Sequence, residues 1–158
     1  MKKTTQIKLV ATDIDGVWTN SIMYYTKDGD YMKAFTTYDG MAVQLLREMS
    51  IPTAIITSEN SEIVLKRAEK LLINDVYINE KNKLSRLKNI CEEKNISLKN
   101  VAYIGDDLND LEVLQNVGFS AMPKNSPILD KFSPNYITDR KGGQGAFREF
   151  VDQIINNR

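Results

Sequence analysis

Residues 7–16 read Ile-Lys-Leu-Val-Ala-Thr-Asp-Ile-Asp-Gly, an apolar run that ends on two acidic residues and a glycine. The aliphatic part, residues 7–11, predicts a buried strand. Asp13 and Asp15 follow directly, and in extended geometry this spacing points both side chains to the same side of the chain. Because sites in parallel α/β sheets lie at the carboxyl ends of the strands, we expect these carboxylates to belong to one.

The remaining chain alternates predicted strands and helices, which favours an α/β fold with a doubly wound, Rossmann-like parallel sheet. We predict further strands at 53–56, 76–78, 101–104, 119–122 and 136–138. We predict helices at 39–49, 60–72, 82–94, 107–117 and 144–155, the first capped by Asp39 and the third by Asn82. Aromatic and polar residues alternate around a Gly-containing turn at 23–35, which predicts a β-hairpin. We expect one domain over 1–158, with the hairpin as an insertion at about 20–37.

The charge balance argues against a polyanionic partner. Lys and Arg number 21, and so do Asp and Glu, in a chain of 158 residues. Such a chain has no overall basic field for nucleic acid or for an anionic membrane. The basic start at Lys2 and Lys3 is followed by polar residues, so we expect neither a signal peptide nor a spanning helix. With one cysteine, Cys91, the chain fits the cytoplasm.

Two missing features narrow the chemistry. The chain contains no histidine, which excludes Ser-His-Asp triads, phosphohistidine enzymes and histidine-based zinc sites. Cys91 lies in a predicted helix, and the residue six positions later is Ser97 rather than an arginine, so the loop of cysteine-dependent phosphatases is missing. Catalysis would therefore depend on carboxylates, Lys, Arg, Thr and a hard metal ion.

Polar clusters follow several predicted strands, at 13–16, 57–59, Lys83 and 105–110. Carboxylates that converge on one crevice repel one another, and a dication relieves that repulsion. Since only oxygen ligands are on offer, magnesium is the expected ion. A calcium loop counted from Asp13 would need glycine at its sixth position and glutamate at its twelfth, where this chain has Trp18 and Tyr24.

Lys83 and Thr57 supply what a phosphate group needs. The lysine adds a point charge, and the threonine adds a hydroxyl beside backbone N–H groups that precede a helix. In such a cradle, one carboxylate can attack phosphorus, and a second can protonate the leaving alkoxide and later deprotonate water.

These segments resemble a known family. Residues 13–17, Thr57, Lys83 and residues 105–110 resemble, in order, the four motifs of haloacid dehalogenase-type phosphatases, across nearly the whole chain. The resemblance implies that Asp13 is the nucleophile and Asp15 the acid/base. It also implies that Mg2+ is held by the side chains of Asp13 and Asp106 and by the backbone carbonyl of Asp15.

The same resemblance gives roles to the supporting residues. Thr57 and Lys83 would bind the transferring phosphoryl group and count, with Asp13 and Asp15, as catalytic. Asp110 would orient Lys83, and Asp107 would join it in the outer shell around the site.

The segments between the motifs leave no room for a cap domain, since only about twenty residues separate Gly16 from Asp39 and the stretch from Thr57 to Lys83 is also short. Residues 15–19, 34–35, 39–40 and 141–149 resemble the capless subgroup that acts on phosphorylated sugar acids. That subgroup implies a homotetramer whose hairpins pack together and whose active sites lie at subunit interfaces.

Within that subgroup, the residues after the motif threonine favour a nonulosonate 9-phosphate (KDN or N-acylneuraminate, the sialic-acid class) over 3-deoxy-manno-octulosonate 8-phosphate. Ser58-Glu59 is similar to the Gly-Glu of the nonulosonate type, and Tyr38 stands where octulosonate enzymes often have arginine. Arg67 and Lys70 would reach the sugar carboxylate from a neighbouring subunit, although a solvated helix face explains them as well. The predicted substrate contacts are Thr57, Ser58, Glu59, Arg67, Lys70, Lys83 and Asn109.

Two alternative functions, from other classes of protein, stay open. A phospho-accepting signalling domain shares the Asp, Thr, Lys and magnesium set, but Asp15 would act as a built-in base and hydrolyse the acyl phosphate quickly. A non-catalytic oligomerisation module is the other, although such modules typically lack part of the catalytic set.

Overall fold

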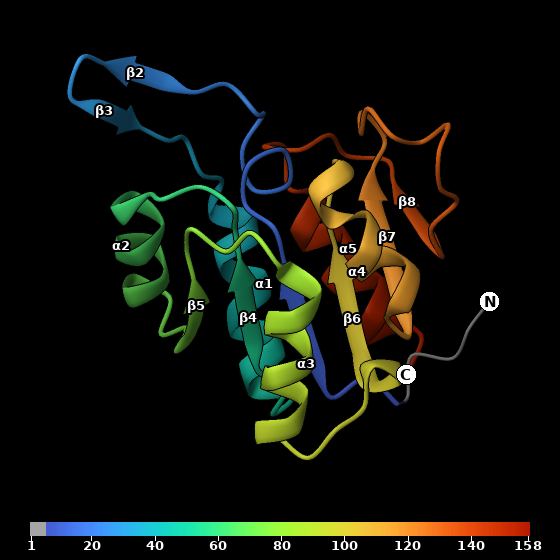
Figure 1. The fold of residues 1–158 in the computed structure, drawn as a ribbon. Coiled ribbons are helices and arrows are strands. Elements are labelled where there is room, and N and C mark those ends of the chain that lie inside the picture. The colour runs from blue at the N-terminus through green and yellow to red at the C-terminus, as the bar shows by residue number, and fades with distance from the viewer. Residues whose placement is uncertain (1–5) are drawn as a thin grey trace.

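The computed structural model describes residues 6–158, so the basic start at Lys2 and Lys3 lies outside the described residues. Its centre is a six-stranded sheet in the order β5-β4-β1-β6-β7-β8, with every neighbouring pair parallel (Figure 1). The strands are β1 (Leu9–Thr12), β4 (Thr53–Ile56), β5 (Asp75–Tyr77), β6 (Val101–Ile104), β7 (Phe119–Pro123) and β8 (Tyr136–Thr138). This order reverses direction at β1, and the carboxyl ends of β1 and β6 lie side by side there.

Helices cover both faces of the sheet, as expected for a doubly wound fold. One face packs against α1 (Thr37–Glu48), α2 (Glu62–Lys70) and α5 (Ala146–Asn156). The opposite face packs against α3 (Lys83–Glu93) and α4 (Leu111–Asn116). Alternation within β1 explains the two cores, because Val10 faces the first and Leu9 and Ala11 face the second. Short 3-10 turns, η1 (Leu98–Asn100) and η2 (Leu108–Asp110), precede β6 and α4.

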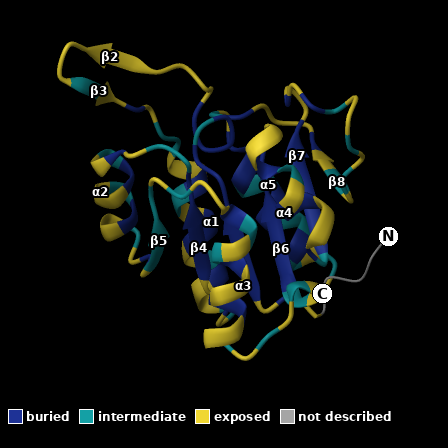
Figure 2. Ribbon diagram, in the orientation of Figure 1, coloured by how far each residue is buried: buried dark blue, intermediate teal, exposed yellow. Residues whose placement is uncertain are grey.

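A hairpin of β2 (Tyr24–Thr26) and β3 (Gly29–Met32) projects from the carboxyl-end edge of the sheet (Figure 1). Gly29 allows its tight turn with a φ of 112°. Most of the hairpin is exposed (Figure 2), including the large side chains of Tyr25 and Tyr31. Within the described chain, no cap domain covers the strand ends, so the expected insertion is confirmed as a hairpin alone.

The predicted start of the first helix is wrong. Thr36 caps α1 by accepting the backbone N–H of Tyr38, and Asp39 lies inside the first turn. The Asp39 carboxylate instead accepts the backbone N–H of Arg148 at 2.9 Å, which ties the start of α1 to α5. The helix predicted at 107–117 is likewise divided into η2 and α4.

Within residues 6–158, no helix combines the length and the apolar character that crossing a membrane requires.

Candidate active site

The loop after β1 carries Asp13 to the centre of the sheet edge. The backbone N–H of Asp13 donates to the carbonyl of Ile104 at 3.1 Å, which joins the end of β1 to the end of β6. Gly16 turns the loop with a φ of 93°, and a Cβ there would lie 1.8 Å from Asp106 Oδ2. The glycine is therefore required, because the Asp106 carboxylate packs directly against the backbone of the Asp13 loop.

Carboxylate oxygens of Asp13, Asp106 and Asp110 lie within 4.8 Å of one another, and all three residues are buried. Burial is the largest cause that raises the pKa of Asp13 well above its usual range, and the charge of Asp110 adds to it. Burial, followed by the charges of Asp110 and Asp107, raises the pKa of Asp106 to about 7. Three carboxylates this close repel one another when all are ionised. The cluster therefore fits a dication that takes oxygen ligands, and magnesium is such an ion.

Asp110 already has protein partners for its oxygens. It accepts hydrogen bonds from Lys83 Nζ at 2.7 Å, from the hydroxyl of Tyr103 and from the backbone N–H of Asp106 at 2.9 Å. A Cβ on Gly105 would lie 2.5 Å from its carboxyl carbon, so the glycine makes room for it. Asp13 and Asp106 are therefore the side chains of this cluster that remain available to a metal ion.

Lys83 lies beneath the cluster, at the first position of α3, after the cap residue Asn82. Its ammonium group is 2.9 Å from Asp13 Oδ1 and 2.7 Å from Asp110 Oδ1, and its side chain is 1% exposed. Burial opposes the charge, but the two aspartates outweigh burial and raise the pKa of Lys83. The lysine therefore stays cationic and brings positive charge to the cluster of Asp13, Asp106 and Asp110.

A pocket of about 180 Å³ opens above these groups. Thr57, the residue after β4, lies in its wall, and the backbone N–H of Thr57 donates to the carbonyl of Tyr77. The side chain of Asn109 donates to Ser58 Oγ at 3.1 Å, which connects two walls of the pocket. The predicted site residues that line it are Asp13, Asp15, Thr57, Ser58, Glu59, Asp106, Asp107 and Asn109.

Arg67 and Lys70 do not join this pocket. The Arg67 guanidinium lies 5.6 Å from the centre of the Phe35 ring, and Lys70 is exposed at the end of α2. Neither lines the pocket of its own chain, so direct substrate contact within one chain is not supported for either residue.

Three residues near the site were not predicted from the sequence. Lys33 donates to Asp15 Oδ1 at 2.7 Å, Tyr103 donates to Asp110, and Ser126 Oγ donates to the carbonyl of Asp106. The available signal was weak: Lys33 and Tyr103 are polar residues within apolar stretches, and Ser126 stands in an ordinary loop.

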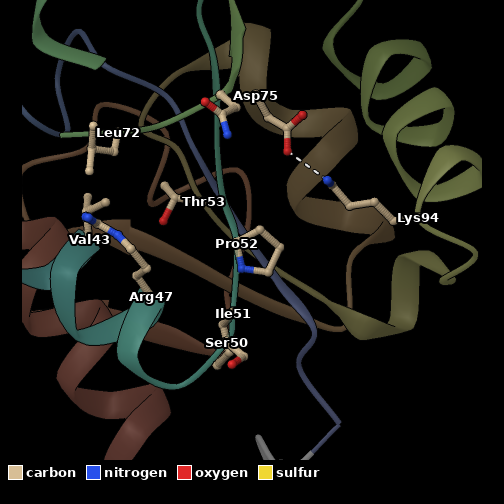
Figure 3. A pocket seen from close by; sticks show the side chains of 10 residues that line it. Val43, Arg47, Ser50, Ile51, Pro52, Thr53, Leu72, Asp75 and Lys94 are labelled. Carbon is tan, nitrogen blue, oxygen red and sulfur yellow. Dashed lines mark ion pairs between the residues drawn. The ribbon is translucent and has the colours of Figure 1, made fainter. Parts of the chain in front are cut away.

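A second hollow of about 420 Å³ lies at the amino ends of β4 and β5 (Figure 3). Lys94 pairs there with Asp75 at 2.9 Å, and Arg47 donates to the carbonyl of Leu71 at 3.0 Å. Both cations are thus already partnered. Despite its volume, this hollow contains none of the three clustered carboxylates, Asp13, Asp106 and Asp110.

Comparison with known proteins agrees with this geometry. A family model described as haloacid dehalogenase-like hydrolase matches residues 47–146. The 3-deoxy-D-manno-octulosonate 8-phosphate phosphatase of Escherichia coli K12 is 34% identical over 153 residues, covering 97% of this chain and 81% of that protein. The Haemophilus influenzae enzyme of the same name is 30% identical over 154 residues, covering 98% and 86%.

Solved structures give the same result. The Moraxella catarrhalis 3-deoxy-D-manno-octulosonate 8-phosphate phosphatase, in complex with a magnesium ion, a phosphate ion and a KDO molecule, superposes with a TM-score of 0.93 at 35% identity and covers 98% of this chain and 89% of that one. A cobalt-bound Haemophilus influenzae phosphatase superposes with a TM-score of 0.93 at 30% identity, covering 98% and 90%.

Proposed function

The chain belongs to the haloacid dehalogenase-like hydrolase family, and from that premise we propose that it is a magnesium-dependent phosphatase of 3-deoxy-D-manno-octulosonate 8-phosphate. One observation carries the proposal: Asp13 is buried between the Lys83 ammonium and the Asp106 carboxylate at the carboxyl ends of β1 and β6. A nucleophile in that position lines a pocket of about 180 Å³, which has room for a phosphate group, and has a cation beside it.

In the first half-reaction, a carboxylate oxygen of Asp13 attacks phosphorus, and the bond from phosphorus to the sugar oxygen breaks. The Asp15 side chain transfers a proton to the leaving alkoxide. The Thr57 hydroxyl and the Lys83 ammonium hold the phosphoryl oxygens while this occurs.

In the second half-reaction, Asp15 removes a proton from water, and the water oxygen attacks the phosphorus of the aspartyl phosphate. Phosphate leaves, and the Asp13 carboxylate is restored. Asp13, Asp106 and the backbone carbonyl of Asp15 would hold the magnesium ion, which when bound supplies positive charge to the phosphate oxygens.

The substrate proposed here differs from the one that Ser58-Glu59 favoured in the sequence. Relatives at 30–34% identity carry the octulosonate name over almost the whole chain, and the preference drawn from Glu59 and Tyr38 is a weaker argument than that. A nonulosonate 9-phosphate is the second candidate, because Glu59 lines the pocket. The signalling and assembly readings are set aside, since the named relatives are phosphatases.

We propose a homotetramer of single-domain subunits in which the hairpins pack together. The support is a group of large, exposed side chains on and before the hairpin: Ile22, Met23, Tyr24, Tyr25, Tyr31 and Met32. Light scattering should give a mass near four times 18.0 kDa. A monomer at micromolar concentration would contradict this assembly and also leave Arg67 and Lys70 without access to any pocket.

The test of the function is a turnover comparison with magnesium present. We expect the ratio kcat/KM to be higher for the octulosonate 8-phosphate than for a nonulosonate 9-phosphate. We expect Asp13→Asn to lose at least about 10³-fold in turnover of either substrate. The matched control is Asp75→Asn, which changes a carboxylate at the other end of the sheet and should keep wild-type turnover. Activity in Asp13→Asn equal to that of the control would exclude covalent catalysis by Asp13.

A further inference from the structure

The carboxylate of Asp15 has a hydrogen-bond partner at one oxygen and none at the other. Oδ1 accepts a hydrogen bond from Lys33 Nζ at 2.7 Å. Oδ2 is buried and has no hydrogen-bond partner among the described residues, while Asp15 as a whole lines the carboxylate pocket. A carboxylate anchored at one oxygen presents the other in a defined direction, and a residue that transfers protons needs such a direction.

Lys33 follows β3 directly, in the segment that joins the hairpin to α1. Its side chain is 1% exposed. A buried ammonium group is costly unless partners compensate it, and an apolar side chain would fill the same space without that cost. Its pKa is raised, because the contacts with Asp15 and Asp30 outweigh the opposing effect of burial, so the group remains charged.

The second partner of Lys33 ties it to another part of the site. Asp30 Oδ2 lies 3.4 Å from Lys33 Nζ and accepts a hydrogen bond from Ser61 Oγ at 2.6 Å. Ser61 stands at the start of α2, shortly after the Thr57 loop. One lysine thus connects the Asp13–Asp15 loop, the hairpin and the helix that follows the phosphate-binding threonine.

We propose that Lys33 is a positioning residue for proton transfer: its ammonium group fixes the orientation of the Asp15 carboxylate at the pocket and leaves Oδ2 as the unpaired oxygen that exchanges the proton. This inference rests on the proposed role of Asp15 as acid/base. Lys33 then influences both half-reactions, since Asp15 gives a proton to the leaving alkoxide and later takes one from water.

Substrates with different leaving groups allow the effect of Lys33 on the two half-reactions to be measured separately. A sugar alkoxide is a strong base and needs a proton to leave, whereas p-nitrophenolate leaves without one. With p-nitrophenyl phosphate, a misplaced Asp15 therefore slows only the hydrolysis of the aspartyl phosphate. The phosphorylated protein should accumulate, and p-nitrophenolate should appear first as a burst.

The experiment compares Lys33→Met with Lys66→Met, a substitution of an exposed lysine on α2, both with magnesium. For Lys33→Met we expect a burst of about one p-nitrophenolate per site, followed by a steady state slower than wild type by roughly 10- to 100-fold. On the sugar-acid phosphate, kcat should fall by a similar or larger factor while KM changes little. Lys66→Met should behave as wild type, and a Lys33→Met variant indistinguishable from it would overturn the proposal.

A purely structural role for Lys33, fastening the hairpin to α2, makes a different prediction. In that case Asp30→Asn would reduce turnover as strongly as Lys33→Met, and neither variant would show a burst. Under the positioning role, Asp30→Asn keeps the 2.7 Å contact between Lys33 and Asp15 and loses much less activity.

If Lys33→Met does not fold, Lys33→Arg decides the question. The planar guanidinium changes where the donor sits, so we expect a lower kcat with little change in KM, and wild-type kcat would overturn the proposal. Failure of the catalytic assignment itself looks different: Asp13→Asn would then retain turnover. An inactive Asp13→Asn beside an unaffected Lys33→Met overturns only the role of Lys33.

Discussion

The two ends of the sheet each carry a hollow and a lysine–aspartate pair, yet they differ in how the charges are exposed. At the carboxyl ends, the Lys83 and Asp13 side chains are 1% and 6% exposed. At the amino ends, the Lys94 and Asp75 side chains are 31% and 21% exposed (Figure 3). The larger volume, about 420 Å³ against 180 Å³, lies at the amino ends.

This difference is the reason for placing the proposed active site where charge is buried rather than in the larger hollow. An ion pair in contact with solvent contributes between about 0 and 1 kcal/mol, so many such pairs can exist without a function. A buried cluster with three carboxylates and one lysine has a large desolvation cost, and folds retain such a cost where chemistry requires it. The following substitutions test whether the two ends behave as differently as this argument requires.

The largest effect is expected from replacing Lys83. Lys83→Met removes the cation from Asp13 and Asp110 and should lower turnover by about 10²- to 10³-fold, as loss of an electrostatic stabiliser does. It should also lower the free energy of unfolding by about 3–5 kcal/mol in the absence of magnesium, because two buried carboxylates lose their partner. Lys94→Met is the matched control at the other end and should keep turnover. Steady-state kinetics measures turnover and urea denaturation measures the free energy of unfolding, and similar losses in the two variants would show that the two ends of the sheet do not differ.

Asp39 tests whether every buried carboxylate matters for turnover, because Asp39 is buried but lies outside the active-site pocket. Burial raises its pKa to about 7, against the opposing effects of the Arg148 backbone N–H and nearby arginines. A raised folded-state pKa means that the folded protein holds a proton which the unfolded chain releases. This contribution to stability is present at low pH and is lost as the pH rises through about 7.

The expected slope from Asp39 is about 1.4 kcal/mol of unfolding free energy per pH unit between pH 5 and pH 7, levelling above pH 7. Asp39→Asn should remove this dependence while its turnover stays within a few-fold of wild type. Urea denaturation at several pH values, with magnesium held saturating, measures it. An unchanged pH profile in the variant would show that Asp39 is not the group responsible.

Magnesium should act at one end of the sheet only. In the metal-free protein the pKa of Asp106 is raised to about 7, so stability carried by its proton is lost as the pH rises through that value. Magnesium then replaces the proton, and it should stabilise the fold by about 2.7 kcal/mol at one hundred times its dissociation constant, more at pH 8 than at pH 6. Thermal unfolding with and without chelator measures the gain. Asp106→Asn should lose most of it and Asp75→Asn none.

The smallest effect is expected at the amino-end hollow, at Leu72. This residue is 69% exposed and has a φ of 57°, a left-handed conformation that costs energy for a side chain. It follows the cap of α2, where glycine is preferred, so Leu72→Gly should raise the free energy of unfolding by about 0.5–1 kcal/mol without changing turnover. A decrease in stability would mean that the leucine makes contacts in the hollow that outweigh its backbone strain.

Sequence reasoning succeeded where the signal is local. The strands predicted at 53–56 and 101–104 match β4 and β6. Strands of a parallel sheet are buried on both faces, so a short uninterrupted apolar run between polar residues is typical of them. Asn82 caps α3 as predicted, since capping involves only residues three positions away.

It failed where a partner is distant in the sequence. Asp39 has a cap-like position, but its acceptor oxygen is used by Arg148, 109 residues further on, while Thr36 supplies the nearby cap. Lys33 reaches Asp15 across 18 residues and the hairpin turn. The spacing of residues in the sequence does not indicate such contacts, because they depend on how distant segments are arranged in the folded chain.

The close packing of Gly105 against Asp110 limits which substitutions these two positions can accept during evolution. The carboxyl group that aligns Lys83 occupies the space that a side chain at position 105 would need. An alanine at 105 or a glutamate at 110 would each drive the lysine from its place, so neither position is free to drift alone. Among descendants of a common ancestor, these two positions should change together or stay fixed, and a lineage that altered one by itself would be expected to have lost the reaction.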